Sequence, residues 1–250
     1  MTLASVGDMG GTADKTAGTT TTHTVVTTSP SAGNAVLVLV AKDNTATSDG
    51  NTNEVTSVTD SQSNTYAKLR EFTNAQTGSN AGATIAVFIS RLATGLTATT
   101  DTITANHDSK TARAIVAWAF SADNNVQLAP SGATDLAEDG VINPGSMSLS
   151  SLPSKEYLFV RALARELASA VFWTSTSGYA EIPMVGTTGG GGGSNMQVMG
   201  EWDIATGTGT TSAPSGGTFT SSDLANTLLA IEEVTAGAMR ASIGMMTHYF

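Results

Sequence analysis

An uninterrupted aliphatic run, Val36 to Val40, follows a turn signal in the segment GNAVLVLVAK at residues 33–42. The run has no polar face, so both of its faces must be covered by other parts of the chain. It is too short to cross a membrane and too rich in β-branched residues to favour a helix. The pattern therefore predicts a central strand of a sheet, around which the rest of the chain is built.

Further strands are predicted wherever apolar residues alternate or run together between turn signals. The segment 29–34 (SPSAGN) reads as a turn. Asp60 begins a second turn, around SQSN, that would join two strands as a hairpin, with Tyr66 and Leu69 as core residues. Residues 124–145 contain prolines and glycines with little periodicity and are predicted to be irregular. The predicted strands of this half are 23–28, 33–42, 55–60, 65–72, 83–90, 99–105 and 112–121.

The second half of the chain repeats the pattern of the first half in the same order, which indicates an internal duplication. The loops also fall in the same places in both halves. The matched segments are AVLVLVAKDN (35–44) with YLFVRALARE (157–166), SNTYAKL (63–69) with TSGYAEI (176–182), IAVFISRLATG (85–95) with MQVMGEWDIATG (196–207), and residues 100–120 with residues 216–234.

Two segments of the second half conflict with the β pattern. Residues 158–173 (LFVRALARELASAVFW) also have helical spacing and, taken alone, favour a helix. The match to 35–44 and the β context favour a strand at 157–165. Five glycines at 189–193 resemble a linker, but their place between two strands predicts a long hairpin loop. No Lys-Ser/Thr follows them, so they are not a phosphate loop.

These patterns predict an all-β fold, a two-sheet β-sandwich of jelly-roll type built from two related halves, 23–122 and 146–234. Near-continuous apolar strands in both halves favour one shared core, with two small sandwiches as the alternative. Residues 1–22 are small and polar and are predicted to be an N-terminal arm. Residues 235–250 form a C-terminal tail.

Composition narrows the possible roles. Charged residues make up 13% of the 250 residues, against about 25% in ordinary globular proteins, and Thr, Ser, Asn and Gly replace them. Such a surface is typical of proteins that present themselves to other subunits, and also of ordinary β-rich surfaces. The net charge of −10, with Lys and Arg scattered singly, argues against nucleic acid as a partner. No signal peptide or membrane span is evident, and cysteine is absent, which suits a reducing cytoplasm.

No catalytic, cofactor or metal site can be singled out. The three histidines lack ligand spacing, and the serines lack a nucleophile-elbow motif. An oxygen-rich cluster fails the spacing of helix-loop-helix calcium sites and reads as a solvated loop. Three glutamates offer carboxylate pairs of the kind used by glycosidases, which any β-rich chain also offers. Three tryptophans could line a sugar-binding face, although Trp118 reads as core. These sets are His23, His107 and His248; Asp43, Asp49, Asn51, Asn53 and Glu54; Glu166, Glu181 and Glu201; Trp118, Trp173 and Trp202.

The C-terminal tail carries an apolar stripe at helical spacing and ends in two aromatic residues. It could fold back on its own sandwich or dock on another subunit. The candidate partner-contact residues are Met239, Ile243, Met246, Tyr249 and Phe250.

Three stretches together resemble β-sandwich structural proteins of tailed bacteriophages. They are GNAVLVLVAKD, VTDSQSNTYAKL, and the segment from ATIAVFISRLATG to ARAIVAWAFSAD. Such proteins share a Gly-Asn/Asp start, an aliphatic strand, a D-x-x-G/S-N-x-Y turn and a closing A-x-x-A-x-x-F strand. The resemblance covers roughly residues 25–234 and implies a virion component, either a capsid decoration or cement protein or a tail or fibre protein, with no catalytic residues.

From this resemblance we expect a non-enzymatic capsid decoration protein on the exterior of the virion, made in the host cytoplasm. Its expected partners are the major capsid protein or other virion subunits, with self-association as a homo-oligomer, a trimer being favoured, and neither nucleic acid nor membrane as partners. The alternative is a tail or fibre protein that binds a host surface glycan, and a polysaccharide-active enzyme is a third, weaker hypothesis.

Overall fold

The computed structural model describes residues 3–44, 48–75, 82–137, 147–148, 154–167, 178–207, 210–211 and 223–234. In these ranges the chain forms antiparallel strands and one 3-10 turn, η1 (Gly192–Ser194). The predicted all-β sandwich is therefore confirmed, while jelly-roll connectivity stays a prediction. Within the described ranges no helix has the length and apolar character needed to cross a membrane.

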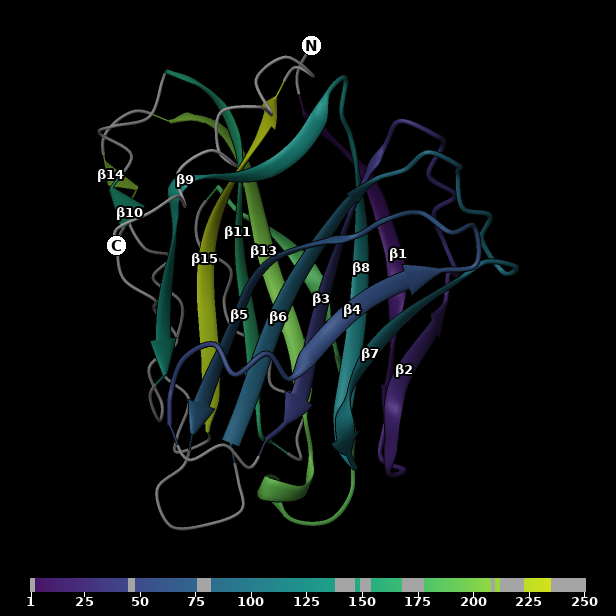
Figure 1. The fold of residues 1–250 in the computed structure, drawn as a ribbon, viewed down its shortest axis with the longest axis vertical. Coiled ribbons are helices and arrows are strands. Elements are labelled where there is room, and N and C mark those ends of the chain that lie inside the picture. The colour runs from purple at the N-terminus through teal and green to yellow at the C-terminus, as the bar shows by residue number, and fades with distance from the viewer. Residues whose placement is uncertain are drawn as a thin grey trace, which may run out of the picture.

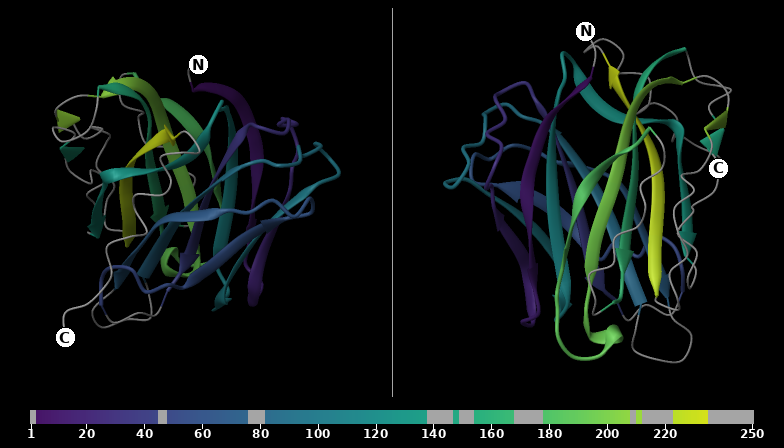
Figure 2. Two further views of the ribbon diagram at one scale, coloured as in Figure 1. Left: turned by 45° about the horizontal axis from the view of Figure 1, so that its top comes forward. Right: turned by 180° about the vertical axis from the view of Figure 1, so that it is seen from behind.

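Three sheets stack in layers, as the two further views in Figure 2 show. Sheet A, in the middle (Figure 1), has the strand order β1-β8-β3-β6-β5, sheet C on one side has β12-β13-β11-β15-β9, and sheet B on the other has β2-β7-β4. The strands of sheet A are β1 (Ala4–Asp14), β3 (Ala35–Asp43), β5 (Ala67–Ala75), β6 (Gly82–Arg91) and β8 (Arg113–Ser121). Those of sheet C are β9 (Asn125–Ala137), β11 (Lys155–Arg165), β12 (Ala180–Gly186), β13 (Gln197–Gly207) and β15 (Leu224–Val234). Those of sheet B are β2 (Gly18–Thr24), β4 (Val55–Asp60) and β7 (Thr102–Lys110), and β10 (Met147–Ser148) pairs separately with β14 (Thr210–Thr211).

The middle position of sheet A explains why β3 has no polar face. Successive side chains of a strand point to opposite faces, and here each face meets another sheet. Leu37 and Leu39 lie in a cluster with Leu158 and Val160 of sheet C. The residues between them, such as Val38, lie in a second cluster with residues of sheet B. The prediction had two sheets, whereas the structure has a third, sheet B. Sheet B covers the second face of β3, as the apolar run required.

The predicted duplication is visible in the topology. The order β5-β6-β3-β8-β1 in sheet A corresponds to β12-β13-β11-β15-β9 in sheet C, strand for strand in sequence order. Edge strands β5 and β12 also each carry a register shift, between Lys68 and Arg70 in β5 and between Ile182 and Val185 in β12. Both halves contribute to the largest shared cluster of buried residues, so their continuous apolar strands lie in one core.

The predicted alignment of 35–44 with 157–166 is wrong by one residue. It places Leu37 with Phe159, yet Phe159 lies in a different cluster from Leu37, on the far face of sheet C. Leu158 and Val160 share the central core with Leu37. The corresponding hydrogen bonds at the two strand ends, from the Asp43 N–H to the Ala112 carbonyl at 3.0 Å and from the Glu166 N–H to the Asp223 carbonyl at 2.9 Å, align Leu37 with Val160. Because a shift of one residue reverses the face of every side chain, the structural register makes Asp43 the equivalent of Glu166.

Residues 1–22 are not a free arm, contrary to the prediction. Residues 4–14 form edge strand β1, paired with β8, and β2 pairs with β7. Gly7 and Gly10 have φ of +143° and +86° and lie at two register shifts of β1, where glycine is favoured. Two glycines of the predicted arm therefore lie at bulges of an edge strand.

Two further predictions in the first 145 residues are wrong. Strands 55–60 and 65–72 are not a hairpin, because β4 pairs with β7 in sheet B whereas β5 pairs with β6 in sheet A. The turn after Asp60 carries the chain from one layer to the next. Residues 124–145 include strand β9, whose Pro130 lies at a register shift of an edge strand, one of the few places where a sheet accepts proline. Strand 157–165 is confirmed as part of β11.

Candidate functional site

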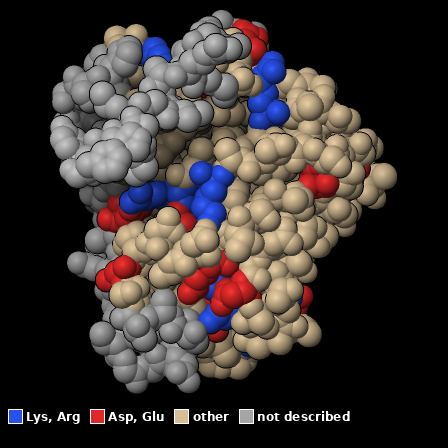
Figure 3. Space-filling model, viewed as in Figure 1, with Lys and Arg blue, Asp and Glu red and all other residues tan. Residues whose placement is uncertain are grey.

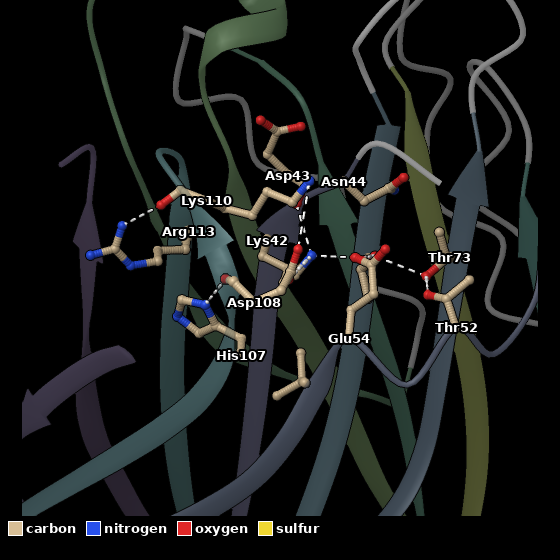
Figure 4. A network of polar contacts seen from close by, with 12 residues as sticks. Lys42, Asp43, Asn44, Thr52, Glu54, Thr73, His107, Asp108, Lys110 and Arg113 are labelled. Atoms are coloured by element: carbon tan, nitrogen blue, oxygen red, sulfur yellow. Dashed lines mark hydrogen bonds and ion pairs between the residues drawn. The ribbon is translucent and has the colours of Figure 1, made fainter. Parts of the chain in front are cut away.

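A cluster of charged and polar side chains lies where β3 ends, at Lys42, Asp43 and Asn44 (Figure 4). The alternation of β3 continues through this end. Lys42 therefore points toward sheet B, like Val40, whereas Asp43 points between sheets A and C, like Ala41. The same strand end thus places a cation on one face of sheet A and a carboxyl group on the other.

The ammonium of Lys42 is fully buried and held by two carboxylates. It forms an ion pair with Glu54 and another with Asp108 Oδ1 at 2.8 Å, and it donates to the carbonyl of Asp43 at 3.1 Å. A buried ammonium without such partners would be strongly unfavourable. These pairs tie the loop before β4 and strand β7 to the central strand.

Glu71, on β5, fixes the start of β4 from the other side. Its carboxylate accepts hydrogen bonds from the backbone N–H groups of Glu54 at 2.6 Å and Val55 at 3.2 Å. Lys68 pairs with the same carboxylate at 2.8 Å. Removing Glu71 would leave two backbone donors at the entry to sheet B without this acceptor.

His107 and Arg113 close the neighbouring side of the network. The Nδ1–H of His107 donates to the carbonyl of Asp108 at 2.7 Å, so its Nε2 accepts from the Thr21 hydroxyl at 3.0 Å. Burial is the main cause that lowers the pKa of His107. Arg113 pairs with Asp14 at 2.7 Å and donates to the carbonyls of Thr20, Thr16 and Lys110. The strand ends of β1, β2, β7 and β8 are thereby joined.

Behind sheet A, the carboxyl group of Asp43 faces Glu166 and Asp223 of sheet C. Glu166 is 4% exposed and Asp223 is 6% exposed. Burial, a hydrogen bond with Asp223 and the nearby Asp43 raise the pKa of Glu166 to about 9. Burial also raises the pKa of Asp43 to about 6, opposed by Lys110 and Lys42.

A second polar cluster lies at the turn that follows β4. The carboxylate of Asp60 accepts from the N–H groups of Gln62 and Asn64, both at 3.0 Å, from the Asn64 amide at 2.9 Å and from the Tyr66 hydroxyl at 3.0 Å. Asn64 in turn accepts from the N–H groups of residues 93 and 94. The predicted role of Asp60 as a turn former is confirmed, and Tyr66 is buried as predicted.

Neither cluster has the form of an open catalytic site. The Lys42 ammonium is engaged in ion pairs with Glu54 and Asp108. The nearby Glu71 carboxylate accepts hydrogen bonds from backbone N–H groups. In the described part of the chain, no group of three or more His, Asp or Glu side chains is placed to hold a metal ion. The arrangement is suited to joining layers of the sandwich.

The oxygen-rich set from the sequence does not converge. Asp49 accepts from the backbone of Ala75, Asn51 from the backbone of Asn53, and Asn53 from Lys68. Glu54 and Asp43 lie on opposite sides of sheet A, each in a cluster described above. Of the histidines, His23 is buried near the end of β2, where its ring forms hydrogen bonds with the Met9 carbonyl and the Thr12 hydroxyl.

The candidate glutamates Glu166, Glu181 and Glu201 do not form one site. Glu181 and Glu201 are directly opposed on β12 and β13. Glu201 is buried and pairs with Arg161 at 3.2 Å, whereas Glu181 is exposed. Glu166 lies in the carboxyl cluster with Asp43, at a different place.

Trp118 and Trp202 meet at the edge of the shared core, one from each half of the chain. Their ring centroids are 6.1 Å apart, and both rings are partly buried. The Trp118 indole donates to Ser5 at 2.9 Å. Trp173, His248 and the tail residues Met239, Ile243, Met246, Tyr249 and Phe250 lie outside the described residues.

Lys42, Glu71 and Arg113 were not predicted as organising residues. A usable signal was present, since Lys42 and Arg113 adjoin apolar runs in strands buried on both faces. A charged residue in such a strand must find a partner. The same signal applies to Arg161 and Arg165 of β11, both fully buried.

Comparison of the chain with protein-family models found no match. Comparisons with characterised proteins and with solved structures found none either.

Proposed function

We propose that this protein is a non-enzymatic structural component of a tailed-bacteriophage particle, a decoration protein that stabilises the shell by bridging capsid subunits. The main support for this proposal is that the charged side chains in the clusters described above pair with other groups of the same chain. The ionic clusters join strands and layers of the sandwich, as Lys42 does between β3, β7 and the loop before β4. A rigid, cross-linked sandwich is the kind of scaffold that a mechanical role requires.

The exterior of sheet B supports the same role. Apart from charged residues at its end, such as Asp108 of β7, whose side chain is 47% exposed, the outward side chains of sheet B are uncharged hydroxyls and amides, aligned across the three strands by the pairing of β2, β7 and β4. They are Thr20, Thr22, Thr24, Ser57, Thr59, Thr102, Thr104 and Asn106. On the face shown in Figure 3, charged side chains form small mixed groups on an otherwise uncharged surface. Such a surface can approach another subunit without desolvating many charges.

In this role the protein adds stability by mass action, because binding to the assembled shell lowers the free energy of the assembled state. A stable contact would bury on the order of 1,200–2,000 Å² in total. We assign part of this contact to the C-terminal tail, with Met239, Ile243 and Met246 as its apolar stripe. Self-association about a symmetry axis, as a trimer, would multiply the contacts per molecule.

The test is truncation after Val234, with occupancy measured on purified capsids that carry the protein. We expect weaker binding with an unchanged circular dichroism spectrum. A triple variant, Met239→Ser with Ile243→Ser and Met246→Ser, should reproduce the loss. The matched control is Ser242→Ala with Thr247→Ser, which leaves the stripe intact. Full occupancy of the truncated protein would refute the role of the tail, and absence of the protein from imaged particles would refute the proposed function.

A tail or fibre protein that binds a host glycan is the second candidate, favoured by the partly exposed pair Trp118 and Trp202. Aromatic faces are common platforms for ring-shaped ligands. Glycan-array binding that is lost in Trp118→Ala and kept in an exposed-site control such as Thr22→Ala would favour this candidate over decoration. Loss of adsorption of the phage particle to its host in Trp202→Ala would also favour the tail or fibre candidate.

A further inference from the structure

Carboxyl groups from both five-stranded sheets lie together at the end of the sandwich where β3 and β11 terminate. Asp43 and Glu166 occupy equivalent positions on the two central strands and both point between the sheets. Asp223 adjoins Glu166, whose backbone N–H donates to the Asp223 carbonyl at 2.9 Å. Three acidic side chains thus meet where the halves of the chain pack together.

Two carboxyl oxygens of this group are buried without a hydrogen-bond partner, Asp43 Oδ1 and Glu166 Oε1. Glu166 is only 4% exposed, and its carboxyl group forms hydrogen bonds with the Asp223 carboxyl group and the backbone of Gly82. An ionised carboxylate in this position would lack the donors that it needs. A bound proton removes the charge and supplies a donor for the Glu166–Asp223 hydrogen bond.

Neighbouring hydrogen bonds show that this end holds the two sheets together. The Asn74 amide, on β5, donates to the Leu224 carbonyl at 3.0 Å, which crosses from sheet A to sheet C. The Asn44 amide donates to the Asn74 carbonyl at 2.9 Å, and the Asn44 N–H donates to the Gly82 carbonyl at 2.9 Å. Repulsion between ionised carboxylates would act directly on this seam.

We propose that Asp43, Glu166 and Asp223 form a proton-operated latch that keeps sheets A and C closed when protonated and loosens this end when ionised. The charged groups that act on Glu166 are Asp43 from β3 and Asp223, which immediately precedes β15. Those that act on Asp43 are Lys42, Lys110 from β7 and Glu54 before β4. The two lysines favour ionisation of Asp43 before that of Glu166, so the latch releases in two steps as the pH rises.

The direction of the effect follows from linkage. Glu166 has an ordinary pKa of 4.5, and the fold raises its pKa to about 9. A raised pKa means that the stabilising effect is complete below the unfolded value and is lost as the pH rises through the folded value. Between these limits the unfolding equilibrium constant should rise by up to about tenfold per pH unit. Asp43 adds a smaller window between 3.8 and about 6.

The experiment measures hydrogen exchange and urea unfolding of the full chain from pH 5 to pH 10. The wild-type protein should lose protection at the amides of Asn44 and Glu166, and its urea midpoint should fall as the pH rises. Glu166→Gln, which keeps a donor but cannot ionise, should show little of this change above pH 7. Glu181→Gln, an exposed glutamate of the same sheet, is the matched control and should behave as wild type.

Identical pH profiles for wild type and Glu166→Gln would overturn the proposal. A urea midpoint that calcium raises at constant pH would also overturn it, because the cluster would then bind a cation instead of a proton. If Glu166→Gln does not fold, urea unfolding of Asp43→Asn between pH 4 and 7 tests the proposal instead. Because Glu166 still titrates above pH 4.5 in this variant, Asp43→Asn should keep part of the slope but lose stability less steeply than the wild type between pH 4 and 6, and a slope equal to that of the wild type contradicts the latch.

Discussion

Gly200 of β13 lies directly against Leu39 of β3, where sheets A and C pack face to face. A Cβ atom on Gly200 would lie 2.7 Å from Leu39 Cδ1, 3.2 Å from Ile182 Cδ1 and 2.9 Å from the Arg161 carbonyl oxygen. The first two contacts are with core side chains, and the third is with the backbone of the adjacent strand. The pair Leu39 and Gly200 therefore reports on the packing of one half of the chain against the other.

Gly200→Ala should destabilise the protein by about 1–3 kcal/mol through overpacking. Leu39→Ala should cost about 2–5 kcal/mol, because Leu39 is 1% exposed and leaves a cavity. In the double variant the added methyl group enters part of that cavity. We expect the double variant to be less destabilised than the sum of the single variants by about 0.5–3 kcal/mol, the range for side chains in contact. The contact with the Arg161 carbonyl persists, so compensation should be incomplete.

Urea unfolding followed by tryptophan fluorescence measures these free energies at one pH. The matched control is Val38→Ala, which lies next to Leu39 but points toward sheet B. Combined with Gly200→Ala, it should be additive within about 0.5 kcal/mol. Additivity of Leu39→Ala with Gly200→Ala would refute the packing of sheet A on sheet C described above.

Two further predictions concern single side chains. Asp60→Ala should lower the free energy of unfolding by about 2–3 kcal/mol, because a charged acceptor of four hydrogen bonds is lost. Thr59→Ser, at the neighbouring exposed position, should change the urea midpoint little. Equal midpoints for both variants would contradict the role of Asp60. The lowered pKa of His107 means that its stabilising effect is present above pH 6.5 and is lost as the pH falls through the folded pKa. His107→Gln removes this contribution, so the stability of the variant relative to the wild type should rise as the pH falls from 7 to 5 in urea titrations, and a difference that does not change with pH would contradict the role of His107.

The central strands of each half could be predicted because they depend on local pattern, whereas the edge strands β1 and β9 were predicted as an arm and as irregular chain. Apolar runs such as 35–41 and 157–164, with turns between them, marked the strands and their duplication. The hairpin at 55–72 could not be judged in this way, because β4 and β5 have the spacing of neighbouring strands yet pair with different partners. Pairing partners distant in sequence leave no local trace.

The candidate site was predicted less well than the fold. Asp60 was predicted from turn chemistry and Tyr66 as a core residue, and the two lie six positions apart and share a hydrogen bond. Lys42 was read only as the end of a strand, because its partners Glu54 and Asp108 follow at different distances along the chain. The tail residues named as partner contacts remain a prediction, since they lie outside the described residues.

The sequence by itself determined that the protein is all-β, that its halves are related, and that Val36–Val40 must be covered on both faces. These properties follow from side-chain alternation and composition, which any local window contains. Only the tertiary structure decided that sheet B covers one face and sheet C the other, and that Asp43 is the equivalent of Glu166. The physical reason is that a sheet's layer and register are set by contacts between distant segments, and a shift of one residue exchanges its buried and opposite faces.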